Sequence, residues 1–313
     1  MEYRQLGSAG LRVSTIGLGT NQFGGKVEQG KVNNIIDLCL DIGINFIDTA
    51  DVYQGGKSEE SLGKALKGRW DRFLVATKVF FKTGEGPNDR GSSRYHIMNG
   101  VEASLKRLNS DHIDLYQLHR WDENTPIEET LRALDDLIQM GKVRYIGASG
   151  FASWQLAQAN MLAEMKGLAP LATIQSHYHM FERGVEREVL PYCASQNVGF
   201  IPYFPLAGGF LTGKYKKDST PPPGSRGESS SYVQGYMNPT YYEVLENLIK
   251  WAEAHGRNVT ELAHAWLLAN PNVCSVISGA TMMDHVNKNA KSVDWSLSKE
   301  EKAEVDSILE QKQ

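Results

Sequence analysis

Four side chains of complementary chemistry follow short apolar segments in the first 120 residues, and together they could move a proton. They are Asp48, Tyr53, Lys78 and His119. A tyrosine phenol has a pKa of about 10, but a lysine ammonium beside it favours the phenolate and lowers that pKa. A carboxylate can hold the lysine in place, and a histidine can donate a hydrogen bond to a carbonyl oxygen. Such a group can protonate an oxygen on which negative charge develops.

Each of these residues also has an ordinary structural interpretation. Asp48 suits a strand end or a helix start, Lys78 a solvated strand end, and His119 a buried core position or a metal ligand. The metal interpretation lacks partners, because His112 lies a strand length away and no Cys or Glu spacing supports a ligand set. We therefore expect no metal, and the case for chemistry rests on the four residues acting together.

Eight short apolar segments alternate with longer segments of helical periodicity, and the chemical residues follow their ends. The predicted strands are Thr15–Gly19, Asn45–Asp48, Phe73–Thr77, Ile113–Gln117, Tyr145–Ser149, Thr173–Ser176, Gly199–Tyr203 and Ser275–Ile277. This alternation predicts an α/β fold, a (β/α)₈ TIM barrel, in which strand ends and the following loops form the site. A doubly wound sheet is the structural alternative, but only Gly17-Leu18-Gly19 resembles its glycine fingerprint.

Two segments depart from this alternation. Tyr3–Val13, with Gly7 and Gly10 at its turn, predicts an N-terminal hairpin before the first barrel strand. Lys214–Pro239 is rich in Pro, Gly and Ser and predicts a long loop after the seventh strand. Loops of that length in a compact domain are commonly functional. We expect this one to fold over a bound cofactor.

Capping residues predict three helix starts. Thr125 with Glu128 forms one expected capping box, with Pro126 at the first helical position. Ser298 with Glu301 forms a second box, and Asn258-Val259-Thr260 marks a third helix start rather than a glycosylation site.

Composition excludes several classes of protein. Hydrophobic residues make up 41% of the 313 residues, enough for a sizeable core, and we expect one domain over residues 1–313. A formal net charge of −4 argues against coating nucleic acid or an anionic membrane. The three cysteines lie far apart, which fits a reducing cytoplasm. The N-terminus has no apolar signal core, and no stretch approaches the roughly 18 apolar residues of a membrane helix.

The chain resembles the aldo-keto reductases over essentially its whole length. The matching segments are Asp48-Thr49-Ala50-Asp51-Val52-Tyr53, Ala76-Thr77-Lys78, Asp114–His119, Gly141–Ser149 and Pro205–Lys214. The resemblance implies a nicotinamide-dependent reductase built on a TIM barrel. It implies Tyr53 as the general acid, Lys78 and Asp48 as groups that tune it, and His119 as the donor that orients the carbonyl.

The resemblance also implies a site for NADP(H), with NAD(H) as the alternative. Ser149 and Gln175 match residues that hold the nicotinamide carboxamide, and Tyr203 matches the aromatic residue that stacks on its ring. The full set of matching cofactor residues is Gly19, Thr20, Asp48, Ser149, Gln175, Tyr203, Leu206, Lys214, Gly279, Thr281, His285 and Asn289. The stretch 279–285 lacks the Lys and Arg that often bind the 2′-phosphate in the family, so we expect a modest preference for NADPH.

A small carbonyl compound is the expected partner, with neither nucleic acid nor membrane, and the oligomeric state stays open. Phe23, Tyr53, His119 and Trp121 are predicted to line the substrate site, with Phe80 and Tyr178 as further aromatic residues after strand ends. An apolar rim suits an aldehyde or ketone better than a phosphorylated sugar.

Two other functions are considered beside the reductase. The chain also resembles the beta subunits of Shaker-type potassium channels, which keep the barrel and bind cofactor while serving as regulatory partners. Because that group carries the same four residues, the residues alone do not separate a reductase from a regulatory subunit. A metal-dependent barrel hydrolase would need converging His and carboxylate ligands, which the sequence does not show.

Overall fold

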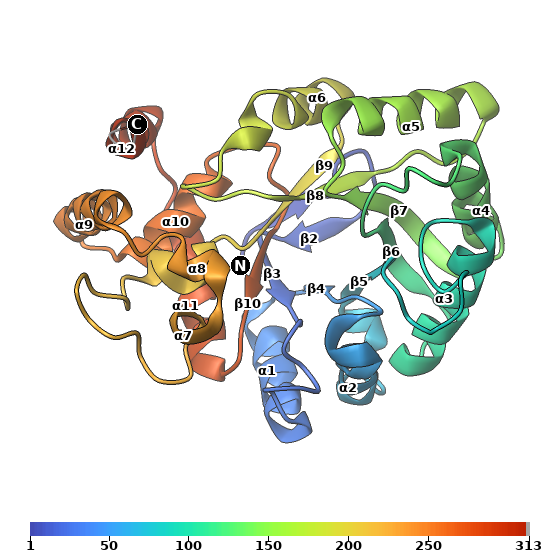
Figure 1. The fold of residues 1–313 in the computed structure, drawn as a ribbon, viewed down its shortest axis with the longest axis horizontal. Helices are drawn as coiled ribbons and strands as arrows, with labels where there is room; N and C mark the ends of the chain where they lie inside the picture. The colour runs from blue at the N-terminus through green and yellow to red at the C-terminus, as the bar shows by residue number, and fades with distance from the viewer. Residues whose placement is uncertain (311–313) are drawn as a thin grey trace.

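Eight parallel strands close into a barrel in the computed structural model, which describes residues 1–310 (Figure 1). They are β3 (Ile16–Gly19), β4 (Phe46–Asp48), β5 (Leu74–Val79), β6 (Ile113–Leu118), β7 (Val143–Ser149), β8 (Thr173–His177), β9 (Gly199–Tyr203) and β10 (Val276–Gly279). Each strand pairs with the next along the chain, and β10 closes on β3 with Gly279 opposite Gly19. The predicted barrel is confirmed, with the last strand lying slightly later than expected.

Helices surround the barrel in Figure 1 and follow the strands in turn. They are α1 (Gln29–Ile42), α2 (Lys57–Ala65), α3 (Arg94–Leu108), α4 (Ile127–Gln139), α5 (Ser153–Lys166), α6 (Val189–Gln196), α9 (Pro239–Ala254), α10 (Val259–Leu268), α11 (Met283–Lys291) and α12 (Lys299–Glu310). Their apolar stripes are buried, as at Val32, Ile35 and Ile36 of α1. Between residues 1 and 310, none of the helices combines the length and apolar character needed to cross a membrane.

The predicted hairpin is present, and it packs against the end of the barrel where the strands begin. β1 (Tyr3–Gln5) pairs antiparallel with β2 (Arg12–Ser14). Gly7 in its turn has φ +58°, and a Cβ there would lie 2.2 Å from the backbone nitrogen of Gly199, the first residue of β9. Glycine is therefore required at this turn, both for its backbone conformation and for the close approach.

Two of the predicted helix starts are confirmed. The Asn258 side chain accepts hydrogen bonds from the amides of Thr260 and Glu261, and the Glu261 carboxylate accepts one from the Asn258 amide. Ser298 and Glu301 exchange the same pair of bonds before α12. Each box satisfies amides that a helix N-terminus leaves without an intrahelical partner.

The capping box expected at Thr125 and Glu128 is wrong. The Thr125 hydroxyl donates to Asp122 Oδ2 at 2.9 Å, and the Glu128 carboxylate accepts from Arg132 one turn further along α4. Pro126 occupies the N-cap position without a side-chain cap. Thr125 therefore lies one residue before the N-cap, where its hydroxyl is held by the Asp122 carboxylate and caps no helix amide.

The segment 214–239 differs from the continuous loop that we predicted. It contains two one-turn helices, α7 (Arg226–Ser229) and α8 (Ser231–Gln234). The buried amide of Gly227 donates to the Tyr215 hydroxyl at 3.1 Å, and Val233 is fully buried. Local packing of these residues therefore orders the second half of a segment whose composition indicated a loop.

Candidate active site

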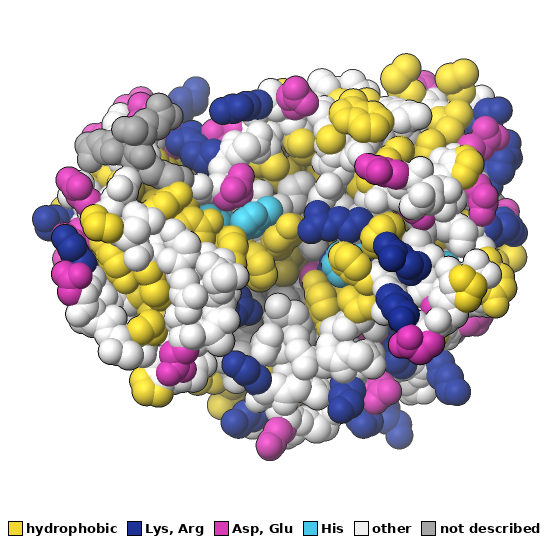
Figure 2. All heavy atoms as spheres, in the orientation of Figure 1, with side chains coloured by type: hydrophobic (Ala, Val, Ile, Leu, Met, Phe, Trp, Pro, Cys, Tyr) yellow, Lys and Arg dark blue, Asp and Glu magenta, His cyan; other side chains and the backbone are white. Residues whose placement is uncertain are grey.

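The carboxyl ends of the barrel strands bring the four predicted proton-transfer residues together. Asp48 is the last residue of β4, Lys78 lies near the end of β5, and His119 directly follows β6. Tyr53 begins the short 3₁₀ helix η1 (Tyr53–Gly56) after β4. The face drawn in Figure 2 is hollowed near the barrel axis, with histidine, hydrophobic and Lys or Arg side chains around the hollow. We call this hollow the mouth of the barrel.

A buried ion pair forms the base of the site. The Lys78 side chain is fully buried, and its Nζ donates to both carboxylate oxygens of Asp48 and to the Thr49 carbonyl, each at 2.7 Å. Burial alone lowers the pKa of Lys78, but Asp48 and Tyr53 outweigh it, so the net pKa is raised. The ammonium therefore stays charged in a site without water contact.

The Tyr53 hydroxyl lies 3.5 Å from Lys78 Nζ, and the Lys78 ammonium is 5.1 Å from the centre of the Tyr53 ring. Burial raises the pKa of Tyr53, Lys78 lowers it and Asp48 raises it, and the net direction is upward. The expectation that Lys78 would bring this pKa below its ordinary value is therefore not met, because burial has the larger effect. The phenol stays protonated at neutral pH and has a proton to donate.

His119 completes the group as a neutral imidazole. Burial, with the nearby Lys78 and Arg120 charges, lowers the pKa of His119 to about 2. Its ring meets the Tyr53 ring edge-on with centroids 6.0 Å apart, and its buried Nδ1 has no hydrogen-bond partner within residues 1–310. A neutral imidazole carries one N–H, so His119 can donate a single hydrogen bond without adding charge.

Two glutamines approach the Asp48 carboxylate from neighbouring strands. Gln175 Nε2 donates to Asp48 Oδ1 at 2.8 Å, and Gln117 Nε2 lies 3.4 Å from the same oxygen. We predicted Gln175 as a cofactor residue but missed Gln117. The sequence signal that could have indicated Gln117 was its position as the last residue of the predicted strand Ile113–Gln117.

A second buried ion pair lies behind the Tyr53 turn, and the sequence did not indicate it. Glu59 of α2 is fully buried, accepts from Thr77 Oγ1 at 2.5 Å and accepts from Arg107 Nε at 2.7 Å. These contacts connect the start of α2, the residue before Lys78 and the end of α3. We call Glu59, Thr77 and Arg107 the clamp, since together they hold the segment that carries Tyr53 against β5.

Asp51 is buried beside this clamp with neither carboxyl oxygen hydrogen-bonded to a side chain of residues 1–310. Burial and the negative charge of Glu59 raise the pKa of Asp51 to about 7, while Arg107 and Lys78 act in the opposite direction. The carboxyl group is therefore protonated through much of the range below neutral pH. Nothing in the sequence distinguished this aspartate from an exposed one.

The residues predicted to hold the nicotinamide lie at adjacent strand ends. Ser149 ends β7, Gln175 lies in β8 and Tyr203 ends β9. Ser149 and Gln175 are buried, and the Tyr203 ring is half-buried and stacks on His177 with centroids 5.3 Å apart at 8°. The predicted residue Thr20 follows β3, and its hydroxyl lies 3.0 Å from the Asp48 carbonyl oxygen and 3.0 Å from Ser58 Oγ. The Thr20 hydroxyl thus connects the end of β3 to the end of β4 and to α2.

The residues predicted for the phosphates and adenosine gather around β10 and the start of α11. Gly19 and Gly279 are paired at the ends of β3 and β10, and a Cβ on Gly279 would meet no atom within 4 Å. The amide and hydroxyl of Thr281 each lie 3.4 Å from His285 Nδ1. This exposed backbone leaves room for a ligand beside it.

Lys214 brings positive charge to the same region. Burial lowers the pKa of His285, and the nearby Lys214 ammonium lowers it further. Lys288, which we considered as another source of charge, forms an exposed ion pair with Asp284 at 2.7 Å. Two further residues were predicted to contact the cofactor. Leu206 is half-buried just before the 3₁₀ helix η4 (Ala207–Thr212), and Asn289 is buried in α11.

The predicted substrate residues divide between the mouth and the core. Trp121 is half-buried and meets Phe151 edge-on with centroids 5.2 Å apart. Phe23 is fully buried in the hydrophobic core, so the structure does not bring it to the mouth as predicted. Tyr178 is also a core residue, with its ring against Trp266 and its hydroxyl donating to a glutamate. Both side chains are buried members of the hydrophobic core cluster.

Phe81 is an aromatic residue of the mouth that we did not predict. Its ring lies edge-on to His119 with centroids 4.8 Å apart and to Phe80 with centroids 5.4 Å apart, and its side chain is 38% exposed. The sequence offered Phe80 and Phe81 as neighbours with no means of choosing between them.

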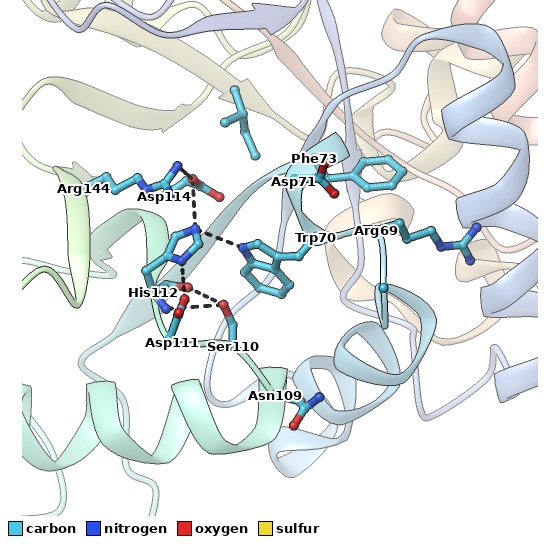
Figure 3. Close-up of a pocket in the computed structure, with 12 residues that line it drawn as sticks. Arg69, Trp70, Asp71, Phe73, Asn109, Ser110, Asp111, His112, Asp114 and Arg144 are labelled. Atoms are coloured by element: carbon cyan, nitrogen blue, oxygen red, sulfur yellow. Dashed lines mark hydrogen bonds and ion pairs between the residues drawn. The ribbon is translucent and has the colours of Figure 1, made fainter.

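A cavity of about 600 Å³ lies at the opposite end of the barrel (Figure 3). Trp70 Nε1 donates to His112 Nε2 at 3.2 Å, and His112 Nδ1 lies 2.6 Å from Asp111 Oδ1. Asp114 is buried and accepts from Arg144 at 3.3 Å. These polar groups form hydrogen bonds and ion pairs with one another. We therefore interpret the cavity as a structural feature at the starts of the strands.

No group of three or more His, Cys, Asp or Glu side chains within residues 1–310 is placed to hold a metal ion. The expectation of a metal-free site stays a prediction.

Comparison with known proteins defines the class of this protein. The model of the aldo/keto reductase family matches residues 15–310, and the chain belongs to that family, as its sequence predicted. A "Probable voltage-gated potassium channel subunit beta" of Arabidopsis thaliana is 38% identical over 306 residues, 94% of this chain and 92% of the relative. The "Uncharacterized oxidoreductase YrpG" of Bacillus subtilis is 38% identical, over 96% of this chain and 93% of the relative. The "Versiconal hemiacetal acetate reductase" of Aspergillus parasiticus is 33% identical, over 96% and 95%.

The raised pKa of Asp51 predicts how stability depends on pH. An unfolded aspartate has a pKa of about 4, whereas the buried carboxyl keeps its proton up to about pH 7. Between these values the folded protein binds more protons than the unfolded chain, so the free energy of unfolding falls as pH rises. We expect Asp51→Asn to remove this fall and to be more stable than the wild type at pH 8 by roughly 2–4 kcal/mol.

Urea unfolding of both proteins at pH 5 and pH 8 measures this effect. Asp41→Asn, at an exposed position of α1, is the matched control and should keep the wild-type pH dependence. An Asp51→Asn protein with the same change between the two pH values as the wild type would show that this carboxyl does not hold its proton.

Proposed function

We propose that this protein reduces aldehydes or ketones to alcohols by hydride transfer from NADPH, with Tyr53 as the general acid. One observation carries the proposal: the buried Lys78–Asp48 ion pair places an ammonium 3.5 Å from the Tyr53 hydroxyl at the mouth of the barrel. Family membership and relatives described as an oxidoreductase and a reductase support carbonyl reduction as the general chemistry.

The four residues divide the work of protonating a carbonyl oxygen. The Tyr53 phenol gives its proton to the oxygen as negative charge develops there, and Lys78 stabilises the phenolate that remains. Asp48 keeps the Lys78 ammonium in position, and the neutral His119 donates a hydrogen bond to the same oxygen. Solvent then returns a proton to Tyr53.

The strand ends around this group fit a nicotinamide cofactor, which supplies the hydride when bound. Ser149 and Gln175 offer polar groups for a carboxamide, and the Tyr203 ring offers a surface for stacking. The open backbone at Gly279 and the cationic Lys214 suit a pyrophosphate and the adenosine beyond it. Backbone amides at the start of α11 add to the attraction for an anion.

Apolar groups favour a small carbonyl compound as the substrate. The Phe81 ring and the Tyr53 ring both lie edge-on to His119 and present aromatic surface beside it, which suits an apolar carbonyl compound. We also propose a reducing cytoplasm as the location of the protein, since Cys39, Cys193 and Cys274 are free and buried.

A regulatory subunit that binds the same cofactor is the second candidate function. It is favoured by the 38% identity to the Arabidopsis thaliana protein described as a probable potassium channel beta subunit. A panel of aldehydes and ketones, assayed with NADPH and NADH by loss of nicotinamide absorbance, separates the two functions. Turnover of small carbonyls supports the reductase, whereas tight cofactor binding without turnover across the panel supports the regulatory subunit.

The general acid assignment predicts the effect of one substitution. Tyr53→Phe keeps the ring but has no proton to give, so kcat for carbonyl reduction should fall roughly 10²–10⁴-fold, the usual range for general acid catalysis. Cofactor affinity, measured by fluorescence quenching, should change little. Tyr95→Phe, at an exposed position of α3, is the matched control. Turnover close to the wild type in Tyr53→Phe would exclude the assignment.

Activity should not require a metal ion, because Lys78 and His119 stabilise the developing charge. Dialysis against a strong chelator should leave kcat and KM unchanged. If chelation abolishes activity and zinc restores it, His119 acts as a ligand and the proposed mechanism is wrong.

The charges around His285 predict a modest preference for NADPH. A 2′-phosphate is a compact dianion that needs cationic donors, and an arginine fork is the best of these. His285 has a lowered pKa and is neutral at pH 7, which leaves Lys214 and the ion-paired Lys288 as the nearby cations. His285→Arg should therefore tighten NADPH binding by about one to two powers of ten and leave NADH binding nearly unchanged.

Dissociation constants for both cofactors, measured by fluorescence quenching, test this prediction. His285→Gln adds a polar side chain without charge and is the control, for which the ratio of the two constants should stay near that of the wild type. Tighter binding of NADH than of NADPH by the wild type would overturn the preference. An unaltered NADPH constant in His285→Arg would show that position 285 does not face the 2′-phosphate.

A further inference from the structure

A single tyrosine of the 214–239 segment reaches back to the barrel and contacts two histidines. Tyr232 lies on α8, and its hydroxyl is 2.7 Å from His177 Nε2 and 2.8 Å from His179 Nε2. His177 is the last residue of β8, and His179 lies just beyond it. The contact therefore joins two parts of the chain that are 55 residues apart.

The direction of the two hydrogen bonds follows from a third one. The Phe181 amide donates to His179 Nδ1 at 3.1 Å, so that nitrogen carries no proton and the proton of His179 is on Nε2. His179 Nε2 therefore donates to the Tyr232 oxygen, which leaves the Tyr232 hydroxyl proton available for His177 Nε2 when the His177 proton is on Nδ1. Burial lowers the pKa of His177, which keeps this ring neutral and able to accept.

The same histidine supports the proposed nicotinamide platform. The His177 ring stacks on the Tyr203 ring with centroids 5.3 Å apart and planes within 8° of parallel. The segment also contacts the next residue, Phe204, through Tyr232 at 5.6 Å between centroids and through Arg226 at 5.5 Å. Tyr232 thus connects the segment to the aromatic residues at the end of β9.

We propose that Tyr232 is a positioning residue for the cofactor, because its hydroxyl fastens the 214–239 segment to the His177 ring that stacks on Tyr203. This inference rests on the proposed function and concerns cofactor binding, not proton transfer. The segment includes Lys214, so fastening it also holds the proposed phosphate-binding cation in place.

Tyr232→Phe tests the inference by removing the hydroxyl and keeping the ring. The dissociation constant for NADPH should rise about tenfold, the effect of losing one to two neutral hydrogen bonds. The KM for the carbonyl substrate should stay within about twofold, and kcat at saturating NADPH should not fall, since the proton-transfer group is unchanged. A role confined to folding would lower the melting temperature without this separation of cofactor affinity from substrate KM.

Tyr236→Phe is the matched control, because the Tyr236 hydroxyl makes long contacts with the same groups. It lies 3.4 Å from the Tyr232 hydroxyl and 3.5 Å from His179 Nε2. NADPH affinity should change by no more than about twofold in this variant, since contacts of this length are weak.

A double-mutant cycle identifies the partner. His177→Phe keeps a ring against Tyr203 but cannot accept the hydrogen bond, so it should weaken NADPH binding about as much as Tyr232→Phe. The double variant should bind NADPH no more weakly than either single one. If the losses of NADPH affinity in the two single variants add up in the double variant, the inference is wrong. It is also wrong if the wild type binds NADPH and Tyr232→Phe binds it equally well. A wild type that binds neither NADPH nor NADH would instead refute the proposed function, and this inference with it.

Discussion

Burial of the Lys78 ammonium is the constraint on which the rest of the site depends. A charge without water contact must be paired and hydrogen-bonded, and Asp48 with the Thr49 carbonyl meets that requirement at 2.7 Å. The pairing places a fixed positive charge beside the Tyr53 hydroxyl and against His119. The Lys78 charge therefore adds to burial in keeping His119 neutral, and it is the charge available to stabilise a phenolate.

The barrel provides the geometry that this pairing needs. Parallel strands end on one side, so residues at the ends of β4, β5 and β6 meet although Asp48 and Lys78 alone are 30 residues apart in the chain. The backbone at Gly279, the end of β10, is open, and a Cβ there would meet no atom within 4 Å. A fixed arrangement of short strands thus carries both the proposed acid group and the proposed cofactor surface.

A further layer of buried polar contacts supports these residues from outside the barrel. The clamp of Glu59, Thr77 and Arg107 holds the Tyr53 turn against β5, and Tyr232 holds the 214–239 segment against β8. Both are polar contacts formed between segments distant in sequence. The central ion pair is therefore supported by polar contacts between segments 18 to 55 residues apart in the sequence.

Periodicity and residue type were enough to predict the barrel, the hairpin and the four residues that meet at its mouth. Strand ends follow from local hydrophobic pattern, and chain order then decides which parallel strand lies beside which. The same local information failed at Thr125, where a nearby carboxylate competes for the hydroxyl, and at Phe23 and Tyr178, whose rings turn toward the core.

Only the tertiary structure decided the charge states and the long-range contacts. The net upward shift in the pKa of Tyr53, the protonated Asp51 and the buried Glu59 depend on how much water each group loses when distant segments pack together. Likewise, nothing near Tyr232 in the sequence indicates His177. Desolvation and contact are properties of the assembled fold, because they arise from atoms that the sequence places far apart.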